Sequence, residues 1–183
     1  TEVGVIPEDW KVVELRAVVI DMLQGVNTAI DKPEYVSSGI PMLKANNIID
    51  QEVMFDGADH ISLKTYSRYS DRFKLQRNDF LFSNIGARLG TGSLLKVDIE
   101  CTFAWNVMRI ISNPRRIVPQ YLSSLMNSPK ISQEIRSNQS GSGMGFVTKG
   151  ILEKIIFPIP SSLAEQQAIA EALSDVDGLI GAV

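Results

Sequence analysis

Short apolar runs separated by turn residues cover most of this chain, and they predict a mixture of short strands and small helices. The segments 40–45, 79–83 and 154–159 are apolar enough for buried strands. Pro119 and Pro129 stand where helices would begin, since proline is favoured in the first helical turn. The other expected elements are strands at 11–13, 93–97 and 103–111 and helical turns at 15–23, 62–69 and 148–153. This order is typical of an α+β fold with small mixed or antiparallel sheets rather than a doubly wound one.

The last strand is stopped by two prolines and followed at once by the pattern of an amphipathic helix. Ser162 and Glu165 have the Ser-x-x-Glu spacing of a capping box, which satisfies free amide groups at a helix start. The apolar residues that follow keep to one helical face: Leu163, Ile169, Leu173, Val176 and Ile180. We therefore expect a domain over residues 1–160 and a helix over 161–183, whose apolar face needs a partner beyond the domain.

Composition excludes several classes of protein. The 183 residues are 44% hydrophobic, which is ordinary for a globular domain, and no window is apolar enough to span a membrane. A single cysteine, Cys101, and a single histidine, His60, exclude a Cys/His zinc site and an internal disulfide. We expect a cytoplasmic protein that holds no metal or cofactor and contacts no membrane.

The net charge of −3 conceals two basic segments between acidic ends. Residues 60–96 carry seven basic and two acidic side chains, and residues 109–149 carry six basic and one acidic. If these two segments meet on one surface, they form an electrostatic footprint for a phosphate backbone. The alternative is an ordinary solvated surface that happens to be basic.

Neither the glycine-rich loops nor the paired carboxylates indicate catalysis. The loops 86–92 and 141–145 lack the spacing of a nucleotide-phosphate motif. The paired acids Asp56/Asp59 and Asp175/Asp177 do not lie in apolar settings that would adjust a pKa for catalysis. We expect no catalytic residues in this chain.

Several polar loop residues have the chemistry needed to contact DNA. Arg88 lies in a glycine-rich loop, from which a guanidinium can reach guanine in the major groove; a solvated arginine on a tight turn fits the sequence equally well. Asn46 and Asn47 follow a strand and carry amides that pair with adenine, although their residue type alone favours a plain turn. Asn138 precedes the second glycine loop and allows the same two interpretations. The aromatic side chains Trp10, Phe80, Phe82, Phe103 and Trp105 lie in apolar runs and are expected in the core.

Four sequence blocks resemble one half of the specificity subunit of type I restriction–modification systems. They are residues 4–15 (GVIPEDWKVVEL), 39–48 (GIPMLKANNI), 75–83 with the loop 86–92, and 147–167 followed by 172–177, which contains the run FPIPSSLAEQQ. The resemblance implies a target-recognition domain that reads one half of a split double-stranded DNA site, followed by the start of a long spacer helix. It further implies a non-catalytic subunit that directs methylation and cleavage by partner modification and restriction subunits. The helix would pair with a second recognition domain or a second copy of the chain.

Loop position and side-chain chemistry together select the residues expected to contact DNA. The base-contacting candidates are Lys44, Asn46, Asn47, Ser83, Arg88, Thr91, Asn138 and Ser142, and the phosphate-contacting candidates are Lys74, Arg77, Lys130, Arg136 and Lys149. We expect Arg77, Arg88, Arg136 and Lys149 on one surface. Two other functions remain open: an assembly element that binds protein only, and the DNA-recognition domain of a single-chain adenine methyltransferase.

Overall fold

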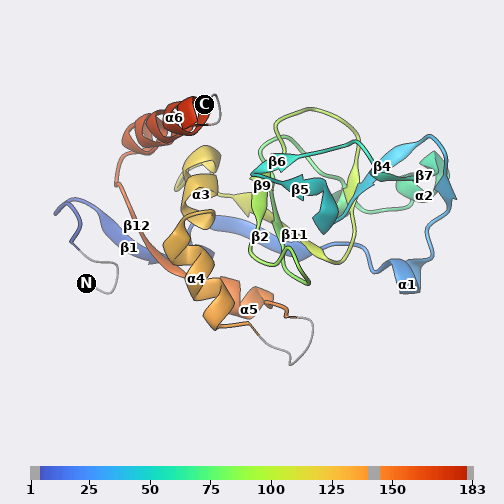
Figure 1. Ribbon diagram of the computed structural model, residues 1–183, viewed down its shortest axis with the longest axis horizontal. Helices are drawn as coiled ribbons and strands as arrows, with labels where there is room; N and C mark the ends of the chain where they lie inside the picture. The colour runs from blue at the N-terminus through green and yellow to red at the C-terminus, as the bar shows by residue number, and fades with distance from the viewer. Residues whose placement is uncertain (1–4, 140–144, 181–183) are drawn as a thin grey trace.

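The computed structural model describes residues 5–139 and 145–180, with side chains through residue 176. The central four-stranded sheet is antiparallel in the order β2 (Val19–Gln24), β11 (Val107–Ser112), β8 (Phe80–Ser83) and β9 (Gly92–Leu94). Helices α3 (Pro119–Met126) and α4 (Pro129–Ser137) lie on one side of it (Figure 1). The observed α+β class is the one that the sequence predicts.

Two apolar cores lie on opposite faces of this central sheet. On the helical side, Phe80, Phe82, Met108 and Ile110 belong to a cluster that includes buried residues of α3 and α4. The alternate residues of the same strands, such as Leu81, belong to a second cluster on the other face. The alternation follows from strand geometry, in which successive side chains point to opposite faces. Burial on both faces explains why the two inner strands, β8 and β11, are mostly apolar.

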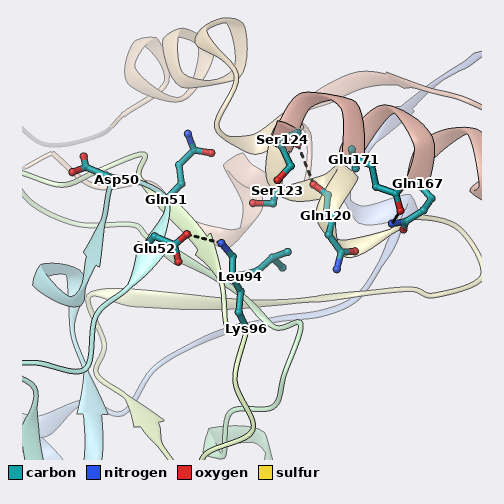
Figure 2. A pocket seen from close by; sticks show the side chains of 12 residues that line it. Asp50, Gln51, Glu52, Leu94, Lys96, Gln120, Ser123, Ser124, Gln167 and Glu171 are labelled. Carbon is teal, nitrogen blue, oxygen red and sulfur yellow. Dashed lines mark hydrogen bonds and ion pairs between the residues drawn. The ribbon is translucent and has the colours of Figure 1, made fainter. Parts of the chain in front are cut away.

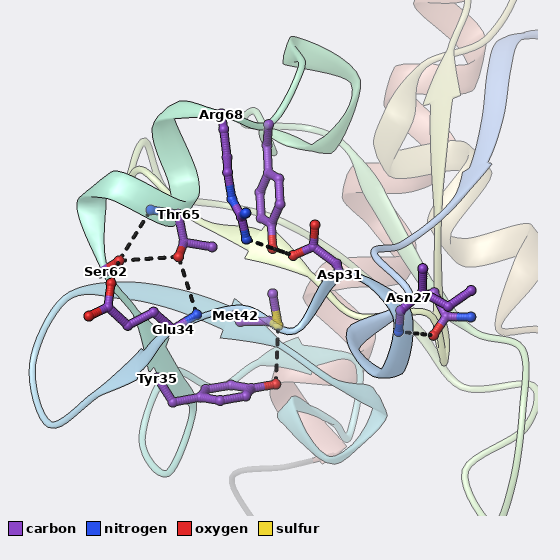
Figure 3. A network of polar contacts seen from close by, with 10 residues as sticks. Asn27, Asp31, Glu34, Tyr35, Met42, Ser62, Thr65 and Arg68 are labelled. Carbon is purple, nitrogen blue, oxygen red and sulfur yellow. Dashed lines mark hydrogen bonds and ion pairs between the residues drawn. The ribbon is translucent and has the colours of Figure 1, made fainter.

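A second four-stranded sheet lies on the right in Figure 1, beside the central one. Its order is β10 (Thr102–Phe103), β4 (Ile40–Leu43), β7 (Asp59–Ile61) and β3 (Tyr35–Val36), and β10 runs parallel to β4. Polar side chains fasten the short helices α1 (Thr28–Asp31) and α2 (Leu63–Ser67) beside it (Figure 3). Ser62 caps α2 by accepting the amide of Thr65 at 3.1 Å, and Tyr69 donates its hydroxyl to Asp31 at 2.6 Å.

The remaining elements connect these sheets and close the domain. The hairpin of β5 (Ile48–Ile49) and β6 (Glu52–Val53) lies against the central sheet, and β1 (Lys11–Glu14) pairs antiparallel with β12 (Ile156–Ile159). The short helices are η1 (Leu15–Ala17), η2 (Ala45–Asn47), η3 (Asp71–Phe73) and α5 (Lys149–Leu152), and the chain continues into α6 (Leu163–Ile180).

Two of the expected elements are wrong. Residues 15–23 do not form one helix, because η1 spans a single turn and the chain then enters strand β2. Residues 103–111 do not form one strand either, because a turn at residues 104–106 divides them between two sheets. In both segments tertiary pairing decides the structure, and local periodicity carries no information about the partner strand.

The base of α6 is joined to the rest of the domain by hydrogen bonds from residues distant in sequence. Ser162 accepts the amide of Glu165 at 3.4 Å, which is one half of the predicted capping box. The Glu165 carboxylate instead accepts the indole N–H of Trp10 at 3.0 Å. Gln166 is buried, and its amide bonds to three backbone groups of other segments. The first and last sequence blocks therefore meet at one junction.

Candidate nucleic-acid interface

Four strand ends of the central sheet open toward the same side, which we call the loop edge. The register pairs Gln24, at the end of β2, with Met108, and it pairs Ser83, at the end of β8, with Val107. The start of β9 lies in the same row, since Gly92 pairs with Phe82. The segments 25–27, 84–91 and 104–106 therefore leave the sheet together. These loops are the natural position for recognition residues on a rigid scaffold.

The region following α4 completes the loop edge. The amide of Gly86 donates to the carbonyl of Gly145 at 3.0 Å, and a β-bridge joins Ile85 to Phe146. A Cβ at Gly90 would lie 3.8 Å from the Ile135 side chain, so the glycine loop runs beside the end of α4. The loop after Ser83 therefore lies against residues 145–146 and beside the end of α4.

Two arginines at the loop edge have no carboxylate partner among the described residues. Arg88 lies in the loop 84–91, and Arg136 is exposed in the last turn of α4. Thr91 donates its hydroxyl to the Arg88 carbonyl at 2.8 Å, which holds the turn that carries the guanidinium. Asn138 is exposed next to Arg136, with its amide donating to Glu134. Four predicted residues therefore lie in neighbouring segments of one edge.

A cleft of about 660 Å³ opens among these loops, with exposed aromatic side chains on its walls. Trp105 and Phe146 line it, and both are exposed, so the expectation that Trp105 belongs to the core is wrong. Asn84 also lines the cleft but is only 2% exposed, and its side-chain oxygen has no hydrogen-bond partner in the described structure. The cleft offers planar apolar faces beside a polar acceptor.

Lys149 lies on the same cleft but is neutralised by carboxylates. Its amino group is 3.3 Å from Oδ1 of Asp21 and 3.9 Å from Glu153. Arg72 binds the other Asp21 oxygen at 2.9 Å. Burial raises the pKa of the Asp21 carboxyl, but hydrogen bonds from Arg72 and Lys149 outweigh it and hold that pKa below its usual value. Sequence reasoning missed Arg72, since nothing in its local pattern distinguishes it from a solvated charge.

The predicted single cationic surface requires a correction at Arg77. Arg77 precedes the start of β8, whereas Arg88 follows its end, so the strand separates the two. Arg77 also pairs with Asp98 at 3.4 Å, and Lys74 pairs with Asp71 at 3.3 Å. All four residues line a different pocket from the cleft. Only part of the expected set is therefore gathered at the loop edge.

Other predicted contacts are occupied or buried. Ser83 is fully buried, and Asn47 is 5% exposed with its amide bonded to Lys44 N and Met54 O, so neither side chain can reach a base. Lys44 is ion-paired with Asp59 and lies over the Tyr35 ring. Asn46 on η2 and Lys130 in the first turn of α4 are exposed, but both lie outside the loop 84–91. Ser142 lies outside the described residues.

A polar groove separates α6 from the β5–β6 hairpin on another side of the molecule (Figure 2). Two pairs of its side chains bond to each other: Lys96 pairs with Glu52, and Gln167 donates to Glu171 at 2.7 Å. Across the part of the chain that the structure describes, no group of three histidine, cysteine or acidic residues is placed to hold a metal ion. No helix within that part has both the length and the apolar character needed to cross a membrane.

Known proteins similar to this chain are specificity subunits. The chain is 28% identical over 184 residues to the type I restriction enzyme MjaVIII specificity subunit of Methanocaldococcus jannaschii, covering 98% of this chain and 42% of that protein. It is 25% identical to the EcoBI specificity subunit of Escherichia coli, covering 93% of this chain and 35% of that one. The chain thus spans about two fifths of the length of these relatives.

Solved structures share the fold. The HsdS subunit of Thermoanaerobacter tengcongensis aligns with a TM-score of 0.70 at 17% identity, covering 98% of this chain and 40% of that one. The S subunit from M. genitalium aligns with a TM-score of 0.62 at 15% identity, covering 92% of this chain and 39% of that one. The sequence profile of the type I restriction modification DNA specificity domain matches residues 7–182. This chain therefore belongs to the type I restriction modification DNA specificity domain family, as its sequence blocks indicate.

Proposed function

We propose that this chain is a target-recognition domain that reads one half of a split double-stranded DNA site through the loop edge of its central sheet. In this proposal the chain is not catalytic, and partner subunits perform methylation and cleavage. The observation that carries it is the convergence of Arg88 and Arg136, both without carboxylate partners in the described structure, on neighbouring segments of one edge.

The chemistry of this edge suits a duplex. Arginine forms two parallel hydrogen bonds with the guanine edge in the major groove, and it also binds phosphate. Arg88 stands on a loop held by its own turn, so we assign it to base contact. Arg136 and Asn138 lie beside it at the end of α4, where they suit the adjacent backbone. The exposed faces of Trp105 and Phe146 supply apolar contact area on the cleft.

We further propose that α6 begins the spacer helix, with the recognition domain ending near residue 160. Leu173 and Val176 are 45% and 51% exposed on this helix, although both belong to its apolar face. Helices bury such a face against a partner when one is present. A second recognition domain or a second copy of this chain would provide it, and the modification subunits would assemble around the pair.

Selection from a randomised duplex pool tests sequence recognition directly. The folded chain should enrich one half-site, and its affinity should fall steeply with salt as counterions are released from phosphates. Arg88→Ala should relax preference at one base pair by about 1–3 kcal/mol. Arg115→Ala is the matched control, because Arg115 is an exposed arginine beyond the opposite end of β11.

Two results would count against the proposal. One is a folded protein that enriches no sequence. The other is an equal loss of affinity in the Arg88 and Arg115 variants with unchanged base preference, which would show that only overall charge matters. Dimerisation through α6 without DNA binding would instead favour a purely assembling role.

A further inference from the structure

One carboxylate on β2 holds two cations that come from different parts of the chain, and one of these, Lys149, lines the cleft. Asp21 lies on the outermost strand of the central sheet, β2. Arg72, on η3, binds its Oδ2 at 2.9 Å, and Lys149, on α5, binds its Oδ1 at 3.3 Å. Both cations remain substantially exposed, so the group lies at the surface rather than in the core.

The Asp21 carboxylate takes the place between Arg72 and Lys149 that a DNA phosphate would take. A phosphate also presents two oxygens to two converging cations, and arginine and lysine are its usual ligands. Lys149 lines the cleft with Trp105 and Phe146, so the position adjoins the proposed DNA surface. Asp21, Arg72 and Lys149 together carry a net charge of +1. A second carboxylate, that of Glu153, lies 3.9 Å from the amino group of Lys149.

We propose that Asp21 occupies a phosphate position at the rim of the cleft, where it restrains Arg72 and Lys149 and limits sequence-independent DNA binding. The inference rests on the proposed function, and it makes Asp21 a positioning residue rather than a DNA contact. Because sequence-independent binding is driven by cation–phosphate contacts, removing two cations from that reaction raises the relative importance of base contacts. Specificity is the difference between the two affinities.

The test uses Asp21→Asn, which removes the charge but keeps an oxygen to accept the amide of Met22, now at 2.8 Å. The probe is a fluorescent duplex that lacks any enriched sequence, titrated between 50 and 200 mM KCl. The variant should bind this duplex more tightly than the wild type. The ratio of the variant's affinity to the wild-type affinity should fall roughly 3.5-fold over that salt range for each additional phosphate that the variant neutralises. The reason is that the slope of log affinity against log salt concentration changes by about 0.9 per phosphate.

Three further variants separate a local effect from a general one. Asp98→Asn frees Arg77, which lines another pocket and not the cleft of Lys149, and it should leave the salt dependence unchanged. Asp21→Glu should resemble the wild type, because it restores the carboxylate. Asp21→Asn combined with Lys149→Gln should neutralise one phosphate fewer than Asp21→Asn alone. Thermal melting of each variant confirms that it is folded.

An unchanged salt slope in Asp21→Asn would overturn the inference, as would equal changes in Asp21→Asn and Asp98→Asn. If the wild type selects a sequence while the Asp21 variant shows no added salt dependence, this inference alone fails. If neither protein binds any duplex, the proposed function fails as well, so the two failures are distinguishable.

Discussion

Gln166, in the Glu-Gln-Gln run at the start of α6, fastens this helix to the domain, and replacing Gln166 with leucine tests this role. Gln166 is 1% exposed, and its side-chain oxygen accepts the amide of Val118 at 2.9 Å. Its side-chain nitrogen donates to the carbonyls of Arg116 and Pro160 at 3.2 and 3.1 Å. Leucine preserves the size and helix propensity of the side chain but removes all three bonds. At about 0.5–1.5 kcal/mol per bond, we expect a loss of about 3 kcal/mol in the free energy of unfolding.

Urea unfolding followed by circular dichroism measures this loss, and the adjacent residue provides the control. The side chain of Gln167 donates to Glu171, one turn along the same helix and at its surface. Gln167→Leu should therefore cost about 0.2–0.5 kcal/mol. A Gln166→Leu variant within about 1 kcal/mol of the wild type, or equal to the Gln167 variant, would refute the view that Gln166 fastens α6 to the domain.

Two further predictions concern the buried charges and the thiol. Burial raises the pKa of the Cys101 thiol to about 12. A thiol reagent at pH 8 should therefore leave the native protein unmodified and react fully in denaturant. Rapid modification of the native protein would contradict the burial of this thiol. Arg109 and Asp79 form an ion pair at 2.7 Å, with both side chains 5% exposed, so Arg109→Leu should cost about 3–5 kcal/mol in urea unfolding at pH 7. Burial already raises the pKa of Asp79, and loss of Arg109 raises it further, so the folded variant takes up a proton before the unfolded chain does. The deficit should therefore shrink as pH falls from 7 toward 4, and a deficit that grows instead would contradict this account.

Local signals in the sequence were sufficient where a motif determines its own structure. Thr148 and Ser162 cap the helices that they were expected to start, and the strands at 40–45 and 79–83 are present with small changes at their ends. The sequence blocks that match the family were sufficient for the fold class, because that likeness spans nearly the whole chain.

The rest depended on partners distant in sequence. The exposure of Trp105 follows from a turn between two sheets, which an apolar run does not reveal. Ser83 and Asn47 are polar in sequence but are buried by packing and by bonds to other segments. The approach of the glycine loop to α4 places Arg88 near Arg136, and strand β8 separates Arg88 from Arg77. Neither relation can be seen in the sequence, because each arginine is an isolated charge in its own stretch.

The loop edge is the part of this domain that can change most easily in sequence. Its connecting segments leave a sheet that is buried on both faces, so residues can be exchanged or inserted there without disturbing either core. Doubling the length of a flexible surface loop costs only about 0.6 kcal/mol in closure entropy. If the loop edge reads DNA as we propose, small changes in these segments can alter the recognised sequence while the scaffold, and the direction in which α6 leaves it, stay constant.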